Sequence, residues 1–280
     1  MRKLIAAALA LCLTASMAAC SGGSGETTAA ASSAASSAAE TTAEETTAAE
    51  TTAAEETTQA AAADVMTYDE YVAAGLETPV TIQAYVQAKQ SYYAEQGTVT
   101  VYLQDQDGGY FAYDMACAEE DYDKLTEGTC IQVSGYKTEW SGEVEIADGT
   151  FTFVEDAEPF VAEPLDVTEY LGTDELETYQ NQKVSFTGLT VEASTDANGN
   201  EAAFLYNYDG SGSQGDDVYF NVSYNGQTFS FLVESYLCDS STEVYQAVEA
   251  LEVGQTIDCE GFLYWYEGAN PHITSLTVAE

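Results

Sequence analysis

An internal repeat constrains the fold of this 280-residue chain more than any other feature. The segment that begins at Leu125 reads L-x-x-G-x-x-I-x-x-x-G-aromatic, and Trp140 follows the second glycine after five residues. The same pattern begins again at Leu251, and there Trp265 follows the second glycine after four residues. Agreement at five fixed positions and a trailing Trp is improbable by chance. We therefore expect two copies of one structural unit.

Short helices are predicted beside each copy. Before the second copy, apolar residues recur at helical spacing and predict an amphipathic helix of about three turns, at Val244, Ala247, Val248 and Leu251. Tyr122 and Leu125 mark a shorter helix before the first copy. A further helix is expected at the start of each unit. Thr67 opens one with a capping-box spacing, Gly75 is its expected stop, and Thr173 opens the other.

Alternating apolar residues predict the strands of each unit. They run through 80–86, 99–103 and 110–117 in the first unit, and through 184–186, 218–222 and 228–238 in the second. Asp107-Gly108 and Asn225-Gly226 are typical of tight hairpins between the second and third strands. Last strands over 144–153 and 272–278 close the two units.

The order strand, strand, strand, short helix, strand, strand is that of the OB-fold, a five-stranded and partly open Greek-key barrel. A single jelly-roll sandwich would leave the helix before each L-x-x-G turn unexplained. The sequence therefore predicts a mainly β protein with two tandem OB-fold-like barrels, each with short helices, over 64–160 and 161–280.

Several residues resemble a known family directly. The run Val99-x-Val101-x-Leu103-x-Asp105-x-Asp107-Gly108, the L-x-x-G turn and Val133-Ser134-Gly135 resemble the OB domains of exported bacterial proteins, for some of which nucleic-acid binding is described. As a whole, 64–280 resembles tandem OB-fold lipoproteins of anaerobic gut Firmicutes. These motifs are turns, hairpins and core positions, so the resemblance implies the fold and leaves the ligand open.

The N-terminus predicts export and lipid anchoring. Arg2 and Lys3 precede an apolar stretch at 4–13, and Met17-Ala18-Ala19-Cys20 resembles the bacterial lipobox, which implies a 1–20 signal peptide and a lipid on Cys20. An ordinary signal peptide with cleavage after an Ala-x-Ala-like site is the alternative. No later segment has eighteen uninterrupted apolar residues. We expect an extracytoplasmic protein held at the cell membrane by its lipid.

Residues 21–63 are almost entirely Ala, Thr, Ser, Glu and Gly. Without aromatic or large aliphatic residues this segment cannot form a core, and it is predicted to be a disordered linker. As a coil it would hold the folded part on the order of 35–40 Å from the anchor. A spacer through the cell envelope is the interpretation we favour.

The chain is strongly acidic, with a formal net charge of −42. From residue 64 onward, 41 acidic residues face only four lysines, at 89, 124, 137 and 183. Such a balance favours solubility, attracts cations and repels polyanions. Nucleic-acid partners are therefore disfavoured, unless Lys89 and Lys137 build an electropositive patch.

Four cysteines follow Cys20, and an oxidising exported compartment could pair them. In two OB-fold barrels, the helix between the third and fourth strands is flanked by a cysteine on each side. This placement favours the pairs Cys117–Cys130 and Cys238–Cys259. Three pairings are open to four cysteines, and four free buried thiols are the alternative.

Chemistry-bearing motifs are scarce. The only histidine is His272, and the sequence has no Ser/His/Asp set, H-E-x-x-H or P-loop, so we expect a protein that is not an enzyme. Two oxygen-rich loops could hold a calcium ion, although the composition of each is also typical of a solvent-exposed turn. Their candidate ligands are Asp196, Asn198, Asn200, Asp209, Asp216 and Asp217. No other cofactor is expected.

Aromatic residues are the better lead. OB-folds bind ligands on the face of strands two and three, framed by the loops after strands one and four. The residues expected at such rims are Tyr92, Tyr93 and Trp140 in the first unit and Tyr264, Trp265 and Tyr266 in the second. Packing at a barrel end or between the barrels is the alternative role. We predict a non-catalytic module that binds a carbohydrate or an envelope protein. Single-stranded nucleic-acid binding and a scaffolding role in the envelope are the alternatives.

Overall fold

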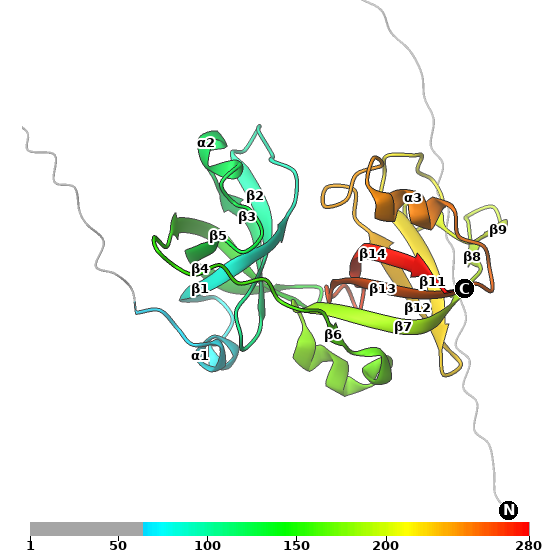
Figure 1. Ribbon diagram of the computed structural model, residues 1–280, viewed down its shortest axis with the longest axis horizontal. Coiled ribbons are helices and arrows are strands. Elements are labelled where there is room, and N and C mark those ends of the chain that lie inside the picture. Colours follow the sequence, from blue (N-terminus) through cyan, green and yellow to red (C-terminus); the bar gives the residue numbers. More distant parts are fainter. Residues whose placement is uncertain (1–63, 280) are drawn as a thin grey trace, which may run out of the picture. The chain divides into compact units, whose positions relative to one another are not determined.

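The computed structural model describes residues 64–279, which contain two closed five-stranded barrels (Figure 1). The first consists of β1 (Thr78–Lys89), β2 (Thr98–Gln104), β3 (Gly109–Ala116), β4 (Cys130–Trp140) and β5 (Glu143–Phe153). Its strand order is β1-β2-β3-β5-β4. The β3–β5 pair is parallel and the others are antiparallel. With α2 (Glu119–Tyr122) between β3 and β4, this is the OB-fold order.

The second barrel repeats this connectivity. Its strands are β7 (Lys183–Glu192), β11 (Val218–Tyr224), β12 (Gln227–Val233), β13 (Thr256–Phe262) and β14 (His272–Val278). They pair in the order β11-β12-β14-β13-β7, and the β7–β11 pairing closes the ring. Helix α3 (Glu243–Glu249) lies between β12 and β13 in the sequence. The predicted fold class is therefore confirmed.

Several short strands and a 3₁₀ turn extend the second barrel. β6 (Leu165–Asp166) pairs with β7, and β10 (Leu205–Tyr206) pairs with β11. In the long β7–β11 loop, β8 (Ser194–Thr195) and β9 (Glu201–Ala202) form a two-stranded ribbon. A 3₁₀ turn, η1, spans Thr168–Tyr170.

Each barrel has its own core, because alternate residues of a strand point to opposite faces. The first core is built from the inward residues of β1 to β5, such as Ile82, Val101, Ala112, Val133 and Ile146. The second is larger in aromatic content and includes Phe186, Phe220, Phe231, Tyr245 and Ile257. The predicted strand periodicity thus agrees with the residues that are buried.

The helices agree in part with the prediction. Thr67 forms the predicted capping box of α1 (Tyr68–Ala73), which ends just before Gly75. Helix α3 spans seven residues, about two turns rather than three. Thr173 opens a 3₁₀ helix, η2 (Asp174–Tyr179), and its side chain makes no capping hydrogen bond.

The second glycine of the repeat is explained by backbone contact. A Cβ atom on Gly261 would lie 2.1 Å from the carbonyl oxygen of His272 on β14, and one on Gly135 would lie 2.6 Å from that of Ala147 on β5. The backbones of the fourth and fifth strands therefore approach too closely for a side chain at either position. The β11–β12 turn has positive φ at both Asn225 and Gly226, as a tight hairpin requires.

The predicted disulfides are not formed: all four cysteines of the described chain are buried free thiols. Cys117 packs in the core of the first barrel, whereas Cys130 is outside that core cluster and contacts Tyr85, which lies opposite it on β1. The two thiols therefore belong to different faces of the barrel wall. Cys238 and Cys259 do share the second core, where burial raises the pKa of Cys238 to about 11.

No helix within 64–279 is long and apolar enough to cross a membrane. The predicted signal peptide, the lipid on Cys20 and the 21–63 linker lie outside the described residues.

Candidate functional site

The outer face of β2 and β3, where a ligand would be expected on the first barrel, is partly covered by the second barrel. Tyr102 and Phe111 are buried there together with Phe262 of β13. The rings of Tyr102 and Phe262 stack at 4.5 Å between centroids, and Phe111 meets Tyr264 edge-on at 5.4 Å. This contact leaves the ligand face of the first barrel only partly open.

His272 completes this aromatic contact. Its Nδ1 is hydrogen-bonded to the hydroxyl of Tyr102 at 2.6 Å, and its ring stacks on Tyr264 at 4.2 Å. Burial lowers the pKa of His272 to about 3, so the ring is neutral at physiological pH. The Nε2 atom is buried and has no partner among the described residues. The only histidine therefore joins the two barrels.

The β4–β5 hairpin of the first barrel is hydrogen-bonded to the β13–β14 loop of the second. The backbone N–H of Trp265 donates to Glu143 at 2.8 Å, and that of Glu267 donates to the carbonyl of Ser141 at 2.7 Å. A Cβ on Gly142 would lie 2.7 Å from the Trp265 ring, so only glycine lets the indole pack there. Burial raises the pKa of Glu143 well above its usual range.

Next to these contacts, a hollow lies on the outer face of β11 and β12. We call it the β11–β12 hollow; its volume is about 670 Å³. Strands β11 and β12 contribute Tyr219, Asn221, Ser230 and Leu232. The β7–β11 loop contributes Ser194, Thr195, Leu205 and Tyr208, and the β13–β14 loop contributes Tyr264 and Tyr266 through Asn270. This is the ligand face of an OB-fold, framed by its two usual loops.

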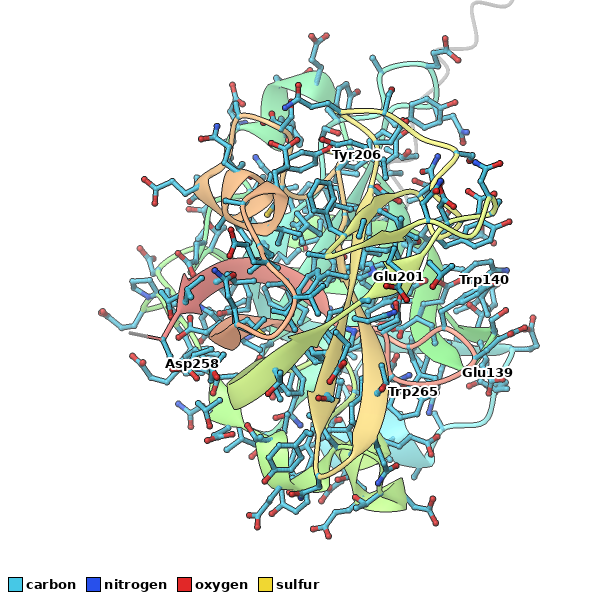
Figure 2. The ribbon with its side chains drawn as sticks, turned by 90° about the vertical axis from the view of Figure 1, so that its right-hand side faces the viewer. Glu139, Trp140, Glu201, Tyr206, Asp258 and Trp265 are labelled. Carbon is cyan, nitrogen blue, oxygen red and sulfur yellow. The ribbon has the colours of Figure 1, made fainter. Side chains whose placement is uncertain are left out.

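Trp140 extends this hollow from the first barrel. It stands at the end of β4, is 54% exposed, and lies 5.2 Å from the Tyr266 ring between centroids. Trp140 and Trp265 are both labelled in Figure 2. Tyr208 of the β7–β11 loop also lines the hollow and is 76% exposed. Aromatic rings that gather around one hollow form an exposed apolar surface of the kind that marks binding sites.

The β11–β12 hollow combines aromatic surface with uncharged polar groups. Asn221, Ser230 and Asn270 supply amide and hydroxyl groups, and no lysine is among the lining residues. Glu267 is the one charged residue of the lining. Burial raises the pKa of Tyr219 to about 12, so its phenol stays protonated and can donate a hydrogen bond.

The four described lysines are engaged elsewhere. Lys137 is buried and donates to three backbone carbonyls at the end of α1. Lys89 donates to the carbonyl of Tyr122 and stands over that ring. Lys124 pairs with Asp121, and Lys183 pairs with Glu127. The electropositive patch that Lys89 and Lys137 would have to build for phosphate binding is therefore not formed.

The predicted aromatic residues divide between two places. Trp140, Tyr264 and Tyr266 come together in the β11–β12 hollow. Trp265 is absent from its lining and packs on Gly142 and the second core. Tyr92 and Tyr93 line a separate hollow beside β2 and β3, so they do not share a rim with Trp140.

Two aromatic residues of the site were missed from the sequence. Tyr219 alternates with the core residues Val218 and Phe220, and this outward position on the second strand was the available signal. Tyr208 lies in the long β7–β11 loop, where Phe204, Leu205 and Tyr206 precede it and were the available signal.

The acidic residues among the proposed calcium ligands do not form a cluster. No group of three or more His, Cys, Asp or Glu side chains within 64–279 is arranged to hold a metal. The Asp196 carboxylate instead accepts the backbone N–H groups of Asn198 and Asn200. Asp209, Asp216 and Asp217 likewise accept backbone N–H groups, from Ser211, Ser213 and Ser235. These carboxylates stabilise turns.

No family model matches the chain, and no curated protein matches it. Among solved structures, the chain is similar to the Ifi202 HINa domain in complex with double-stranded DNA, at 12% identity and a TM-score of 0.32, over 73% of this chain and 96% of that one. It is also similar to a murine DNA-binding protein bound to double-stranded DNA, at 13% identity and a TM-score of 0.34, over 72% and 98%. A third is a Replication Protein A heterotrimer bound to single-stranded DNA, at 14% identity and a TM-score of 0.28, over 72% and 49%. Such likeness concerns the fold alone, and the OB-fold assignment here rests on strand order.

Proposed function

We propose that this protein is a non-catalytic binding module for a neutral carbohydrate, which it holds in the β11–β12 hollow. One observation carries the proposal: Trp140, Tyr208, Tyr219, Tyr264 and Tyr266 line a hollow whose other groups are mostly uncharged amides and hydroxyls. The apolar faces of sugar rings pack on aromatic rings, while amides and hydroxyls exchange hydrogen bonds with sugar hydroxyls.

The charge of the hollow favours this ligand over single-stranded nucleic acid, the alternative that the OB-fold suggests. Binding to a nucleic-acid backbone combines stacking with Lys and Arg side chains that neutralise phosphates. All four described lysines have partners away from the hollow, and Glu267 would repel a phosphate. The aromatic rings alone would not compensate for this repulsion.

We further propose that the protein belongs with the tandem OB-fold lipoproteins of Firmicutes and acts outside the cytoplasm. The lipobox at Cys20 supports this location, and the lipid would anchor the barrels to the membrane. The ligand would then be an extracellular glycan of the cell's surroundings or its envelope. An envelope protein at the same face, and a purely scaffolding role, are the competing functions.

The test is a fluorescence titration of the purified protein with neutral oligosaccharides, single-stranded DNA and calcium, at low and at physiological salt. Trp140 is half-exposed in the hollow and serves as the reporter. We expect saturable quenching or a blue shift with one oligosaccharide class, and no response to DNA or calcium. A Trp265→Phe variant keeps only the Trp140 signal and should respond in the same way.

Matched variants locate the binding. Tyr266→Leu and Tyr208→Leu should each weaken binding by about tenfold, because each removes one stacking surface. Tyr93→Leu removes a similarly exposed ring of the other hollow and should change nothing. Saturable DNA binding would favour the alternative, and a lack of any response would favour a protein partner or a scaffold.

A further inference from the structure

A second hollow lies between β2 and β3 of the first barrel and the segment after β12 of the second, and it has a different chemical character. We call it the β2–β3 hollow; its volume is about 490 Å³. Four of its lining residues are tyrosines: Tyr92, Tyr93, Tyr113 and Tyr236. Three of them are exposed, with Tyr93 at 44%, Tyr113 at 47% and Tyr236 at 67%. A group of exposed tyrosines around a hollow is an unusual arrangement for a protein surface unless it binds something.

The walls of this hollow are held in place by backbone contacts. The hydroxyl of Tyr92 donates to the carbonyl of Cys117 at 3.2 Å, which fixes the ring. The N–H of Ser91 donates to the carbonyl of Tyr236 at 2.8 Å, so the loop after β1 and the segment after β12 are tied together. These two hydrogen bonds connect the β1–β2 loop to the end of β3 and to the segment after β12.

The only charged groups in the lining are acidic. They are Asp114 and Glu234, and no lysine accompanies them. Glu234 is 7% exposed. Its Oε1 accepts the backbone N–H of Tyr236, whereas its Oε2 is buried and has no hydrogen-bond partner among residues 64–279. An unpaired buried carboxylate oxygen is costly and calls for a positively charged partner or a proton.

We propose that the β2–β3 hollow binds an organic ammonium cation, with the tyrosine rings around the cationic group and Glu234 and Asp114 as its counter-charges. The faces of tyrosine rings attract ammonium groups through the ring quadrupole, and cages of such rings recognise quaternary ammonium ligands. The strongly acidic chain would also raise the local concentration of cations.

The two hollows differ in the ligand that they select. The β11–β12 hollow has amide and hydroxyl groups and a single carboxylate, which suits a neutral ligand. The β2–β3 hollow has two carboxylates and four phenol rings. A bare metal ion is a poorer fit than an organic cation, because no cluster of three metal-ligating acidic, His or Cys side chains exists within the described chain. This site is independent of the proposed carbohydrate site.

The experiment is a calorimetric titration of the purified protein with choline, and with its neutral isostere 3,3-dimethylbutan-1-ol as the matched ligand. It is run at pH 8, where Glu234, whose pKa burial and Asp217 raise to about 7, is mostly ionised. We expect saturable binding of choline in the millimolar range and no saturable binding of the alcohol. Equal binding of the two ligands, or no binding of choline, overturns the proposal.

Variants test whether choline binds in the β2–β3 hollow or elsewhere on the surface. Tyr113→Leu should weaken choline binding by about fivefold, while Tyr113→Phe keeps the ring and should retain it. Glu234→Gln keeps the shape of the side chain, removes the counter-charge, and should weaken binding by about tenfold. Trp140→Leu, in the other hollow, should leave choline binding unchanged. If Trp140→Leu lost choline binding and Tyr113→Leu kept it, the cation would bind in the β11–β12 hollow, and the proposal would be overturned.

Discussion

At the scale of single residues, Lys137 shows how a buried charge is satisfied without an acidic partner. Its Nζ donates to the carbonyl oxygens of Tyr71, Val72 and Ala74, at 2.9, 2.9 and 3.0 Å, and so caps the end of α1. An ammonium group has three protons, and all three are used. The residue that the sequence suggested for phosphate binding thus serves the fold.

Replacing Lys137 with Met is expected to destabilise the protein by about 2 kcal/mol, because the three carbonyl oxygens at the helix end lose their donor. The measurement is urea-induced unfolding followed by circular dichroism. Lys124→Met is the matched control: Lys124 is exposed, pairs with Asp121 and lies 5.9 Å from the Phe153 ring centroid, so its loss should cost much less than the loss of Lys137. Equal losses in the two variants would contradict a capping role for Lys137.

Glu234 should make stability depend on pH. Its folded-state pKa of about 7 lies above the ordinary value of 4.5, because burial and Asp217 oppose ionisation. A raised carboxyl pKa contributes stability that is fully present below pH 4.5 and is lost as pH rises through 7. Relative to the wild type, Glu234→Gln should therefore gain about 3 kcal/mol of stability between pH 4.5 and pH 8.

This prediction is checked by urea unfolding of both proteins at pH 4.5 and pH 8. The comparison cancels the contributions of Glu143 and of His272, whose pKa burial shifts in opposite directions, because both residues are present in each protein. A free-energy difference between the two proteins that does not change with pH would show that Glu234 ionises freely in the folded state.

At the scale of secondary structure, the sequence predicted the elements that local patterns determine. The period-2 alternation located the inward residues of the barrel strands, and Asn225-Gly226 located a hairpin, because these signals depend only on neighbouring residues. The ribbon of β8 and β9 was missed, since strands of two residues have too few positions to show a period.

The candidate site was only partly predictable for a related reason. The loop positions of an OB-fold predicted Tyr92, Tyr93 and Trp140 at one rim, because that prediction treated each barrel as independent. Contact between the barrels covers Tyr102 and Phe111 and brings Trp140 to Tyr266 instead. Such contacts join residues more than a hundred positions apart, and no local pattern encodes them. The Cys117–Cys130 pairing failed likewise, because spacing does not tell which face of the barrel wall each thiol occupies. Cys238 and Cys259 do share a core, and the structure nevertheless has both as free thiols.

The contact between β13 and β14 leads to a prediction for the repeat itself. Gly261→Ala should destabilise the second barrel by about 3 kcal/mol or more, because the new Cβ would meet the β14 backbone at His272, and backbone cannot move aside cheaply. Thermal unfolding measures the loss. Gly75→Ala is the control, since a Cβ there has its nearest neighbour at 3.9 Å and should be tolerated. If Gly261→Ala is as stable as Gly75→Ala, the repeat glycine is not explained by close approach.

At the scale of the whole molecule, the two barrels share an aromatic cluster and should unfold together. Tyr102 stacks on Phe262 and is hydrogen-bonded to His272, so it connects the first barrel to two strands of the second. Calorimetry of the wild type is expected to show a single transition. Tyr102→Ala should cost about 3–5 kcal/mol and split that transition into two. Tyr208→Ala, which removes a ring that is 76% exposed, should leave one transition near the wild-type temperature.

Net charge is the other property that acts over the whole molecule. The sequence has a formal charge of −42, and the described residues form only two ion pairs. Repulsion among so many carboxylates opposes the compact state, and dissolved salt screens it. Raising sodium chloride from about 0.02 M to about 0.5 M should therefore increase the melting temperature by about 3–6 °C.

A charge-reduced variant separates screening from the general effects of salt. Glu155, Asp156 and Glu158 are exposed and adjacent, and none is in an ion pair within the described chain. Replacing them with Gln, Asn and Gln removes three negative charges without touching either core, the β11–β12 hollow or the β2–β3 hollow. The variant should melt higher than the wild type at low salt, and the difference should shrink as salt is added. A difference that persists at high salt would mean that local contacts, rather than repulsion across the molecule, set the stability of this acidic protein.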